Sequence, residues 1–412
     1  MQSCRSALAS LFEHRFFLPV VTAAGVLLRL ALLLAVRHSQ GFPDEQEYQR
    51  LGISLLHEHR FALAGWPTAY RAPGEPMFLA GVYAVFGQHL PLVKVAQELL
   101  LAVVPVFCWR TARLLGVGLG WANLAAMFAA FDPALNYAAT TIYPTALTAV
   151  TLTAGVFYAA LAARDDTSGA AIKSGIAFGT AGLLTTTLVP LSVLVGLYLA
   201  WKRSMRVALI VCVLGMLPAV VWLARNRSVI GEWVLATNGG VNLYLGANDA
   251  ATPRSGNWVE APLSIREGEV AVEGRYTQMA EGWIRQHPAR WVELSVCRAL
   301  LVVDSVGRPI TAGIHSGRVA QLVGWAMLPV VLLGMSGLWV FRGTAVAWFL
   351  AMALGLVTIS GAVTIVKPRF RFPCDPLLMT FAAGTLAQMG RRSASALDGP
   401  REAEVIALTS LE

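Results

Sequence analysis

Residues 16–36 read FFLPVVTAAGVLLRLALLLAV, a run in which Arg29 is the single charged residue. A helix needs about 17 to 25 apolar residues to cross the hydrocarbon core of a bilayer, so this run predicts a membrane span. It is too long for a removed signal peptide and has no small-residue cleavage site before Arg37. We therefore expect a retained first span that leaves the N-terminus in the cytoplasm.

Comparable apolar runs recur along the chain. Of the whole sequence, 56% is hydrophobic and 14% is charged, against about 25% charged in an average soluble domain. The sequence predicts an all-α polytopic membrane protein of about ten helices, with one transmembrane domain over 1–390 and a cytoplasmic tail over 391–412. The expected spans are 16–36, 92–112, 120–137, 144–163, 172–189, 190–201, 206–225, 319–340, 344–366 and 373–390.

Two features of these spans need an explanation. Pro190 interrupts 172–201, so one kinked helix and two short helices both fit the sequence. Glu98 lies within a span, where a charge is costly and is usually paired. Lys94 precedes Glu98 by one helical turn, so we expect these two residues to satisfy each other.

The distribution of basic residues predicts the orientation of the chain. Lys and Arg cluster in the short loops that an even number of spans places in the cytoplasm. Both termini are then cytoplasmic, and two long polar segments, 37–91 and 226–318, face the outside. We expect a plasma membrane location, the bacterial inner membrane with periplasmic loops. The net charge of +8 follows from this topology and from contact with anionic lipid or phosphate, so nucleic acid is not an expected partner.

The first outer segment opens with GFPDEQEY at 41–48. Pro43 favours the start of a helix, and Asp44 and Glu45 fill its first turn. One or two carboxylates would then lie at the membrane boundary. Acids at this position also complement the helix dipole in any surface helix, so the spacing alone does not assign them to a reaction.

An apolar stripe continues along one face of the same predicted helix. Tyr48 follows Asp44 by four residues and therefore shares its face. Leu51 and Leu55 extend that face, and we expect the stripe to lie on the membrane surface.

A proline-rich turn follows in the same outer segment. Residues 66–76 read WPTAYRAPGEP, and their prolines restrict the backbone. We expect this turn to present Arg71 and Glu75 beside the first helix of the segment.

The second outer segment carries WLARN at 222–226 and TNGGVNLYLGAN at 237–248. Asn238 and Asn242 offer hydrogen-bond donors and acceptors, and Tyr244 offers a stacking face, which together suit sugar hydroxyls. Asn-Gly-Gly also forms ordinary turns, so a structural role remains an alternative.

A basic motif opens the last span. Residues 367–373 read KPRFRFP, which places Lys367, Arg369 and Arg371 within five residues. Such cations either bind a phosphate or anchor a span end at the membrane interface.

In this order, the three motifs resemble those of the GT-C glycosyltransferases of family 39, the protein mannosyltransferase and aminoarabinose transferase group. In these proteins an Asp-Glu-x-x-Tyr helix precedes an Arg-x-Pro-x-x-Pro turn. The resemblance implies a GT-C-like bundle that moves a sugar from a polyprenyl-phosphate carrier to a hydroxyl acceptor, which is a protein, a lipid or a cell-envelope glycan. Transfer would occur on the outer face of the membrane, with inversion in a single displacement.

The chain departs from this family pattern at two places. Relatives often carry an acid near the outer start of the fourth span, where this chain has Tyr143-Pro144-Thr145. Glu75 stands where relatives often have an apolar or aromatic residue, and it is either specific to the substrate or solvated.

The implied reaction assigns roles to the motifs. An alcohol nucleophile needs a carboxylate to take its proton, and Asp44 is the first candidate and Glu45 the second. A lipid phosphate that leaves needs preorganised cations, and Arg71 either supplies one or pairs with the acids. The residues expected to contact substrate are Tyr48, Arg71, Glu75, Asn238, Asn242, Tyr244, Lys367, Arg369 and Arg371.

Cofactors and other functions are less constrained. The five cysteines have no CxxC spacing and the seven histidines are scattered, so we predict no metal site, although a divalent cation stays open as a cofactor. Two other functions fit the spans. One is a transporter or flippase for a lipid-linked glycan, which needs a polar path through the bilayer; the other is a non-catalytic paralogue that binds polyprenyl lipid.

Overall fold

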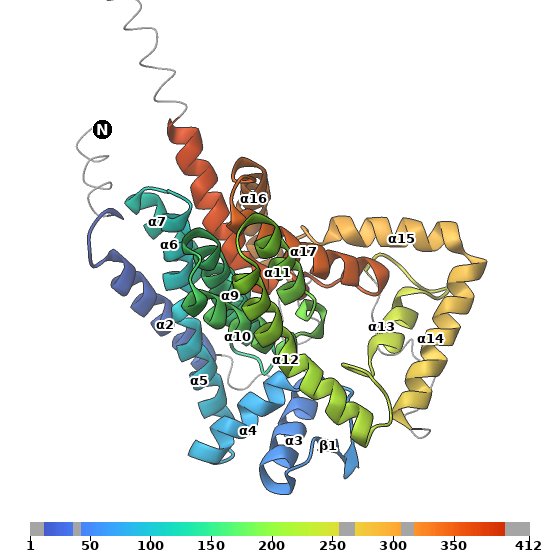
Figure 1. The fold of residues 1–412 in the computed structure, drawn as a ribbon. Helices are drawn as coiled ribbons and strands as arrows, with labels where there is room; N and C mark the ends of the chain where they lie inside the picture. The colour runs from blue at the N-terminus through green and yellow to red at the C-terminus, as the bar shows by residue number, and fades with distance from the viewer. Residues whose placement is uncertain (1–11, 36–42, 255–267, 306–316, 392–412) are drawn as a thin grey trace, which may run out of the picture.

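The structure is a computed structural model that describes residues 12–35, 43–254, 268–305 and 317–391, and this part of the chain is mostly helical (Figure 1). Six of its helices are long and apolar enough to cross a membrane. They are α2 (Phe17–Ala35), the run Leu90–Leu114 made of α5 (Leu90–Leu101) and α6 (Val103–Leu114), α9 (Thr145–Asp165), α12 (Met205–Val229), the apolar part of α16 (Gly317–Val340) and α17 (Ala345–Val363). The predicted all-α membrane architecture is confirmed.

Shorter helices occupy the other predicted spans. They are α7 (Leu119–Ala130), α10 (Ser168–Leu184), α11 (Leu191–Lys202) and a final helix over 375–391. The span expected at 120–137 is not continuous. Helix α7 ends at Ala130, and Asp132 caps the short helix α8 (Pro133–Ala138), because its carboxylate accepts from the backbone N–H of Ala134 at 3.0 Å.

The region around Pro190 forms two helices rather than one. The backbone of Thr185 is extended after α10, a 3-10 turn (η1, Thr186–Leu188) follows, and Pro190 precedes α11. Both helices pack on α12. Gly175 allows α10 to approach α12 closely, because a Cβ atom at this position would lie only 2.8 Å from Cβ of Leu214. These helices share the largest apolar core with α9, α17 and the final helix.

The first outer segment forms a compact unit, drawn in blue at the foot of Figure 1. It contains α3 (Pro43–Glu58), a two-stranded antiparallel hairpin (β1, Ala62–Leu63; β2, Trp66–Pro67) and α4 (Gly74–Phe86). The hairpin turns through Ala64 and Gly65, which have φ values of 51° and 81°. Helices α3 and α4 pack on each other, since a Cβ atom at Gly52 would lie 2.8 Å from Cβ of Leu79.

The apolar stripe of α3 contacts protein, which corrects the expectation that it lies on the membrane surface. Leu51 is completely buried and clusters with Phe61, from the start of the hairpin, and Trp222, from α12. Leu55 packs against the same cluster. The stripe therefore attaches α3 to the end of a membrane helix.

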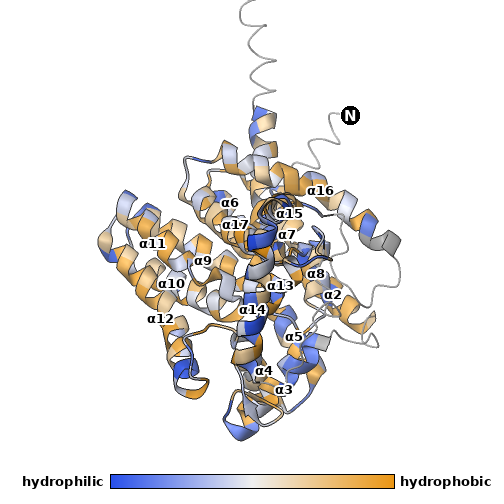
Figure 2. Ribbon diagram, turned by 90° about the vertical axis from the view of Figure 1, so that its right-hand side faces the viewer, coloured by the Kyte–Doolittle hydropathy of each residue, from blue (hydrophilic) through white to orange (hydrophobic). Residues whose placement is uncertain are grey.

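The second outer segment is also helical. Helix α12 continues to Val229, and the segment then contains α13 (Gly239–Gly246), α14 (Glu269–Gln286) and α15 (Pro288–Leu301). Figure 2 shows hydrophilic residues on α14, whereas α10, α11 and α12 are mostly hydrophobic. Two 3-10 turns, η4 (Pro368–Phe370) and η5 (Phe372–Cys374), connect α17 to the final helix.

A buried ion pair joins α2 to α5. Nε of Arg29 lies 2.9 Å from Oε2 of Glu98, and both side chains are almost fully enclosed. Arg29 also donates to Oδ1 of Asn136 on α8 at 3.3 Å. The expected pairing of Glu98 with Lys94 is therefore wrong: the partner comes from another helix and removes both charges from the lipid.

Gln97, the neighbour of Glu98, fixes the segment that follows α8. Its side-chain Nε2 donates to the backbone carbonyls of Ala139 and Thr141, each at 3.1 Å. These carbonyls lie in a stretch without regular helix, where unpaired backbone groups would be costly in an apolar setting. The intramembrane polar cluster thus positions the chain just before Tyr143.

Candidate active site

Asp44, the first candidate base, lies in the first turn of α3 between two partners. Its Oδ1 atom is 2.7 Å from Nη2 of Arg71. Its Oδ2 atom accepts a hydrogen bond of 3.0 Å from the hydroxyl of Tyr143. The side chain keeps 29% of its surface exposed, so the carboxylate is both oriented and accessible.

Arg71 connects two acids of α3. Its Nε atom lies 2.7 Å from Oε2 of Glu47, and the guanidinium also lies near the rings of Tyr48 and Tyr70. Burial opposes the charge of Arg71, but Tyr48 and the carboxylates raise its pKa overall. Of the two roles left open for Arg71, pairing with acids is the one seen in the structure.

Tyr143 brings the basic motif to the same place. The guanidinium carbon of Arg369 lies 4.6 Å from the centroid of the Tyr143 ring. The ring of Tyr48, on α3, meets Tyr143 edge-on at 5.7 Å and 79°. Residues from α3 and from η4 therefore converge on one aromatic side chain, which lies just before α9.

Two residues of this group were missed in the sequence. Glu47 follows Asp44 by three residues on one helix, and this spacing could have indicated that both face Arg71. Tyr143 was noted only as a departure from the family pattern. No local signal indicates its role, because its partners come from distant segments.

Two other acids of the first outer segment, Glu45 and Glu75, are buried. Glu45 is 4% exposed and Glu75 is 0% exposed. Among the described residues, neither carboxyl oxygen of Glu75 has a hydrogen-bond partner. Burial, with a smaller contribution from the charge of Glu45, raises the pKa of Glu75 to about 8. Solvation of Glu75 is excluded, and its carboxyl is mainly protonated at neutral pH.

The WLARN motif attaches the first outer segment to α12. Arg225 donates to the carbonyls of Phe61 at 2.9 Å and Thr68 at 2.7 Å. Asn226 donates to the carbonyl of Val234 at 2.7 Å. The backbone N–H of Ala69 donates to Oε1 of Glu269, at the start of α14, at 2.6 Å. These contacts fix the backbone on both sides of the hairpin, close to Arg71.

The three residues expected to contact sugar lie on or next to α13. Asn238 directly precedes the helix, and Asn242 and Tyr244 lie within it. In the described part of the chain, none of the three is hydrogen-bonded to Asp44. Tyr244 alone among them lines a surface cavity beside α14.

The basic motif divides into different environments. Arg371 is 2% exposed and forms two contacts with Asp375, Nε to Oδ1 at 2.7 Å and Nη2 to Oδ2 at 3.2 Å. It also donates to the carbonyl of Val302 at 2.8 Å. Arg371 is therefore committed to an interior ion pair, contrary to the expected phosphate contact, whereas Arg369 reaches Tyr143 and Lys367 is half-buried just before η4.

No protein-family model matches the sequence, and no curated protein matches it. Among solved structures, the fold is similar to the archaeal oligosaccharyltransferase AglB from Archaeoglobus fulgidus, solved in complex with an inhibitory peptide and a dolichol-phosphate. The TM-score is 0.51 at 13% sequence identity, with 94% of this chain and 52% of that chain covered. A second similar structure is ArnT from Cupriavidus metallidurans bound to undecaprenyl phosphate, with a TM-score of 0.45 and 13% identity over 94% of this chain and 80% of that chain.

The archaeal oligosaccharyltransferase is a GT-C glycosyltransferase. The fold of the present chain is similar to its fold. The chain spans about half the length of the oligosaccharyltransferase, and at this sequence identity the likeness concerns the fold.

A divalent cation was left open as a cofactor, and it stays a prediction. In the residues described, no group of three or more His, Cys, Asp and Glu side chains is arranged to hold a metal ion. Asp44 and Glu47 are both engaged by Arg71. A metal here would need other ligands or a rearranged Arg71.

Proposed function

We propose that this chain is a membrane glycosyltransferase that moves a sugar from a polyprenyl-phosphate carrier to a hydroxyl acceptor. The observation that carries the proposal is the position of Asp44, which lies between Arg71 and Tyr143 while Arg369 stacks on the same Tyr143. An accessible carboxylate and a half-buried cation from distant segments meet there. A transfer that forms a new glycosidic bond and releases a phosphate needs both.

The chemistry follows from these groups. The acceptor oxygen attacks the anomeric carbon of the donor sugar, the bond from that carbon to the phosphate oxygen breaks, and the bonding electrons leave with the phosphate. The acceptor proton passes to Asp44, whose oxygens keep lone pairs beyond those used by Arg71 and Tyr143. Arg369, with Lys367 nearby in sequence, stabilises the phosphate that leaves. One displacement inverts the anomeric centre.

The location and orientation belong to the same proposal. Basic residues in the short loops support cytoplasmic termini and an active site on the outer face of a bacterial inner membrane. The polyprenyl chain of the donor would then lie in lipid. Its phosphate would lie at the membrane boundary, next to Arg369.

The alternative transporter function finds less support in the structure. A flippase for a charged headgroup needs polar residues along a path through the bilayer. Arg29 and Glu98 are buried and neutralise each other, so they line no such path.

The test is sugar transfer by the purified chain in detergent. Wild type, Asp44→Asn and the control Glu232→Gln, an exposed acid between α12 and α13, would be supplied with polyprenyl-phosphate-linked labelled sugars and a host envelope extract. We expect transfer by wild type and by the control, and a loss of at least 100-fold in Asp44→Asn, since positioned bases typically contribute about 10²–10⁴-fold. Equal transfer by Asp44→Asn would overturn the assignment of the base, and no transfer by any variant would favour the transporter or the lipid-binding paralogue.

A further inference from the structure

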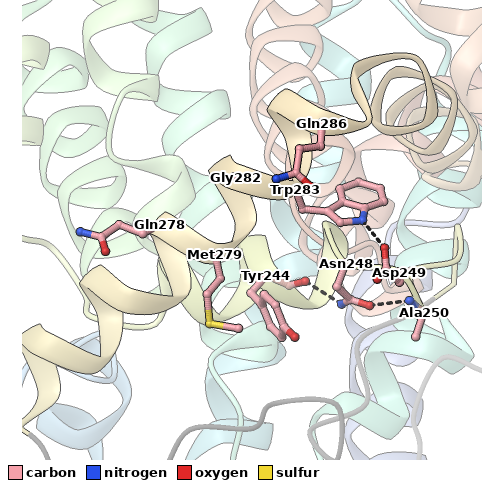
Figure 3. A pocket seen from close by; sticks show the side chains of 9 residues that line it. All are labelled: Tyr244, Asn248, Asp249, Ala250, Gln278, Met279, Gly282, Trp283 and Gln286. Atoms are coloured by element: carbon pink, nitrogen blue, oxygen red, sulfur yellow. Dashed lines mark hydrogen bonds between the residues drawn. The ribbon is translucent and has the colours of Figure 1, made fainter.

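A cavity of about 530 Å³ lies beside α13 and α14, in the second outer segment (Figure 3). Its volume falls in the range of about 300–1,000 Å³ that is typical of small-molecule sites. The walls come from α13, from the turn after it and from one face of α14. The lining residues are Tyr244, Asn248, Asp249, Ala250, Gln278, Met279, Gly282, Trp283 and Gln286.

Two aromatic side chains of this cavity are held in place. The indole Nε1 of Trp283 donates to Oδ1 of Asp249 at 2.7 Å, and the indole stacks on His287 at 4.9 Å and 26°. The ring of Tyr244 packs against Tyr276, whose side chain is buried, at 5.4 Å. A preformed aromatic surface binds with little loss of side-chain entropy.

The turn after α13 is also preformed. Asn248 is 8% exposed, donates to the carbonyl of Tyr244 at 2.8 Å and accepts from the backbone N–H of Ala250 at 2.8 Å. Figure 3 shows these bonds beside the contact of Trp283 with Asp249, while Gln278 projects away from this group. The shape of this wall therefore does not depend on a ligand.

The charge of the cavity limits what it binds. Among the described residues that line it, Asp249 is the single charged one, and none of these nine residues is basic. A phosphate would meet a carboxylate there and no cation, so the headgroup of a lipid-linked donor is a poor fit. Aromatic faces suit the C–H faces of a sugar ring, and amide and carboxylate oxygens suit its hydroxyls.

The helices that form the cavity contact segments that carry residues of the candidate active site. Glu269, at the start of α14, binds the backbone of Ala69 in the proline-rich turn. Tyr244 and Phe370, which follows Arg369, both pack against one apolar cluster of α13 and α14. The helices that form the cavity therefore contact the segment that carries Arg71 and the residue that follows Arg369.

From these observations we propose that the cavity beside Trp283 binds a neutral sugar ring of the acceptor. The inference rests on the proposed glycosyltransferase function and adds that the acceptor is a glycan or glycolipid. Trp283 supplies the stacking face, and Asp249 and Gln286 supply the polar contacts. The donor phosphate stays at Arg369, outside the cavity.

The first experiment measures binding without catalysis. Saturation-transfer NMR would be recorded on the full chain in detergent with a panel of methyl hexopyranosides and methyl pentofuranosides. We expect wild type and Asp44→Asn to saturate the C–H protons of at least one glycoside, with a signal at least fivefold lower in Trp283→Ala. Trp283→Phe should keep part of the signal, and Trp233→Ala, which removes an exposed tryptophan outside the cavity, should keep all of it. Thermal unfolding confirms that each variant is folded.

The outcomes separate the two proposals. No binding of any glycoside to folded wild type, or equal binding to wild type and folded Trp283→Ala, would overturn the acceptor site. Binding that depends on Trp283, together with no sugar transfer by wild type, would keep the site and reject the enzyme. In an active enzyme, Trp283→Ala should raise the KM for the acceptor at least tenfold and leave the KM for the donor unchanged.

Discussion

The guanidinium carbon of Arg369 lies 4.6 Å from the ring centroid of Tyr143, so a cation near the end of the chain rests on the residue that binds Asp44. The two residues are far apart in the sequence. Tyr143 thereby contacts both the expected general base, Asp44, and the cation expected to bind phosphate, Arg369. Its hydroxyl donates to Asp44, and its ring face contacts Arg369.

Substitutions of Tyr143 should separate these two contributions. Tyr143→Phe removes the hydrogen bond to Asp44 and keeps the ring beneath Arg369. We expect kcat to fall about tenfold, which corresponds to roughly 1.4 kcal/mol, with the donor KM unchanged. Tyr143→Leu also removes the ring and should raise the donor KM. Steady-state kinetics with both substrates would measure this, and a raised donor KM in Tyr143→Phe would speak against the division of roles.

Arg71→Lys should impair the enzyme although it keeps the charge. Arg71 uses different nitrogens for Asp44 and Glu47, and a lysine ammonium does not reproduce this fork. We expect a fall of about tenfold or more in kcat with a small change in thermal stability. Arg60→Lys, in the loop after α3, is the control. Wild-type kcat in Arg71→Lys would show that the orientation of Asp44 does not depend on the fork.

Glu75→Gln should change how stability depends on pH. Burial, with the nearby charge of Glu45, raises the pKa of Glu75 from 4.5 to about 8. The folded state therefore holds this proton more tightly than the unfolded chain, and stability is lost as the pH rises from about 4.5 to about 8. At about 1.4 kcal/mol per pKa unit, the loss is of the order of a few kcal/mol.

The amide of Glu75→Gln does not ionise, so its unfolding temperature should fall less between pH 6 and pH 9 than that of wild type. Thermal unfolding in detergent measures the difference, and Glu281→Gln, an exposed acid of α14, should behave as wild type. Parallel curves for wild type and Glu75→Gln would refute a buried neutral Glu75.

Substitution of Arg371 should lower the stability of the fold, whereas substitution of Arg369 should weaken binding of the donor. Arg371→Met leaves Asp375 buried without its partner, and we expect a loss of about 3–5 kcal/mol in stability, seen as a lower unfolding temperature. Arg369→Met should stay folded and show a higher KM for the lipid-linked donor. An unchanged donor KM in folded Arg369→Met would remove Arg369 from phosphate binding.

Hydropathy predicted the positions of the membrane helices well, because a helix that crosses the hydrocarbon core needs a long run of apolar side chains. The breaks were harder to predict. The span expected over 120–137 ends early because Asp132 and Pro133 start a new helix. The two readings at Pro190 could be separated only once the packing of α10 and α11 on α12 was known.

Pairings within the candidate site depended on contacts between distant segments. Asp44 and Arg71 were recognisable from their motifs, but Tyr143 carries no local sign of its role. Glu98 pairs with Arg29 rather than with Lys94, and Arg371 pairs with Asp375. In each case the geometry of helix packing selected the partner, and sequence spacing supplied only candidates.

The contact of Arg225 with the carbonyl of Thr68 has a consequence for biogenesis. The two residues are 157 positions apart, so the proline-rich turn leaves the ribosome long before its anchor is made. Until α12 has been made, the turn that carries Arg71 lacks its contact with Arg225. The nascent protein therefore holds an incomplete site at the membrane, and the site is complete only after Arg369, near the last span, has been translated as well.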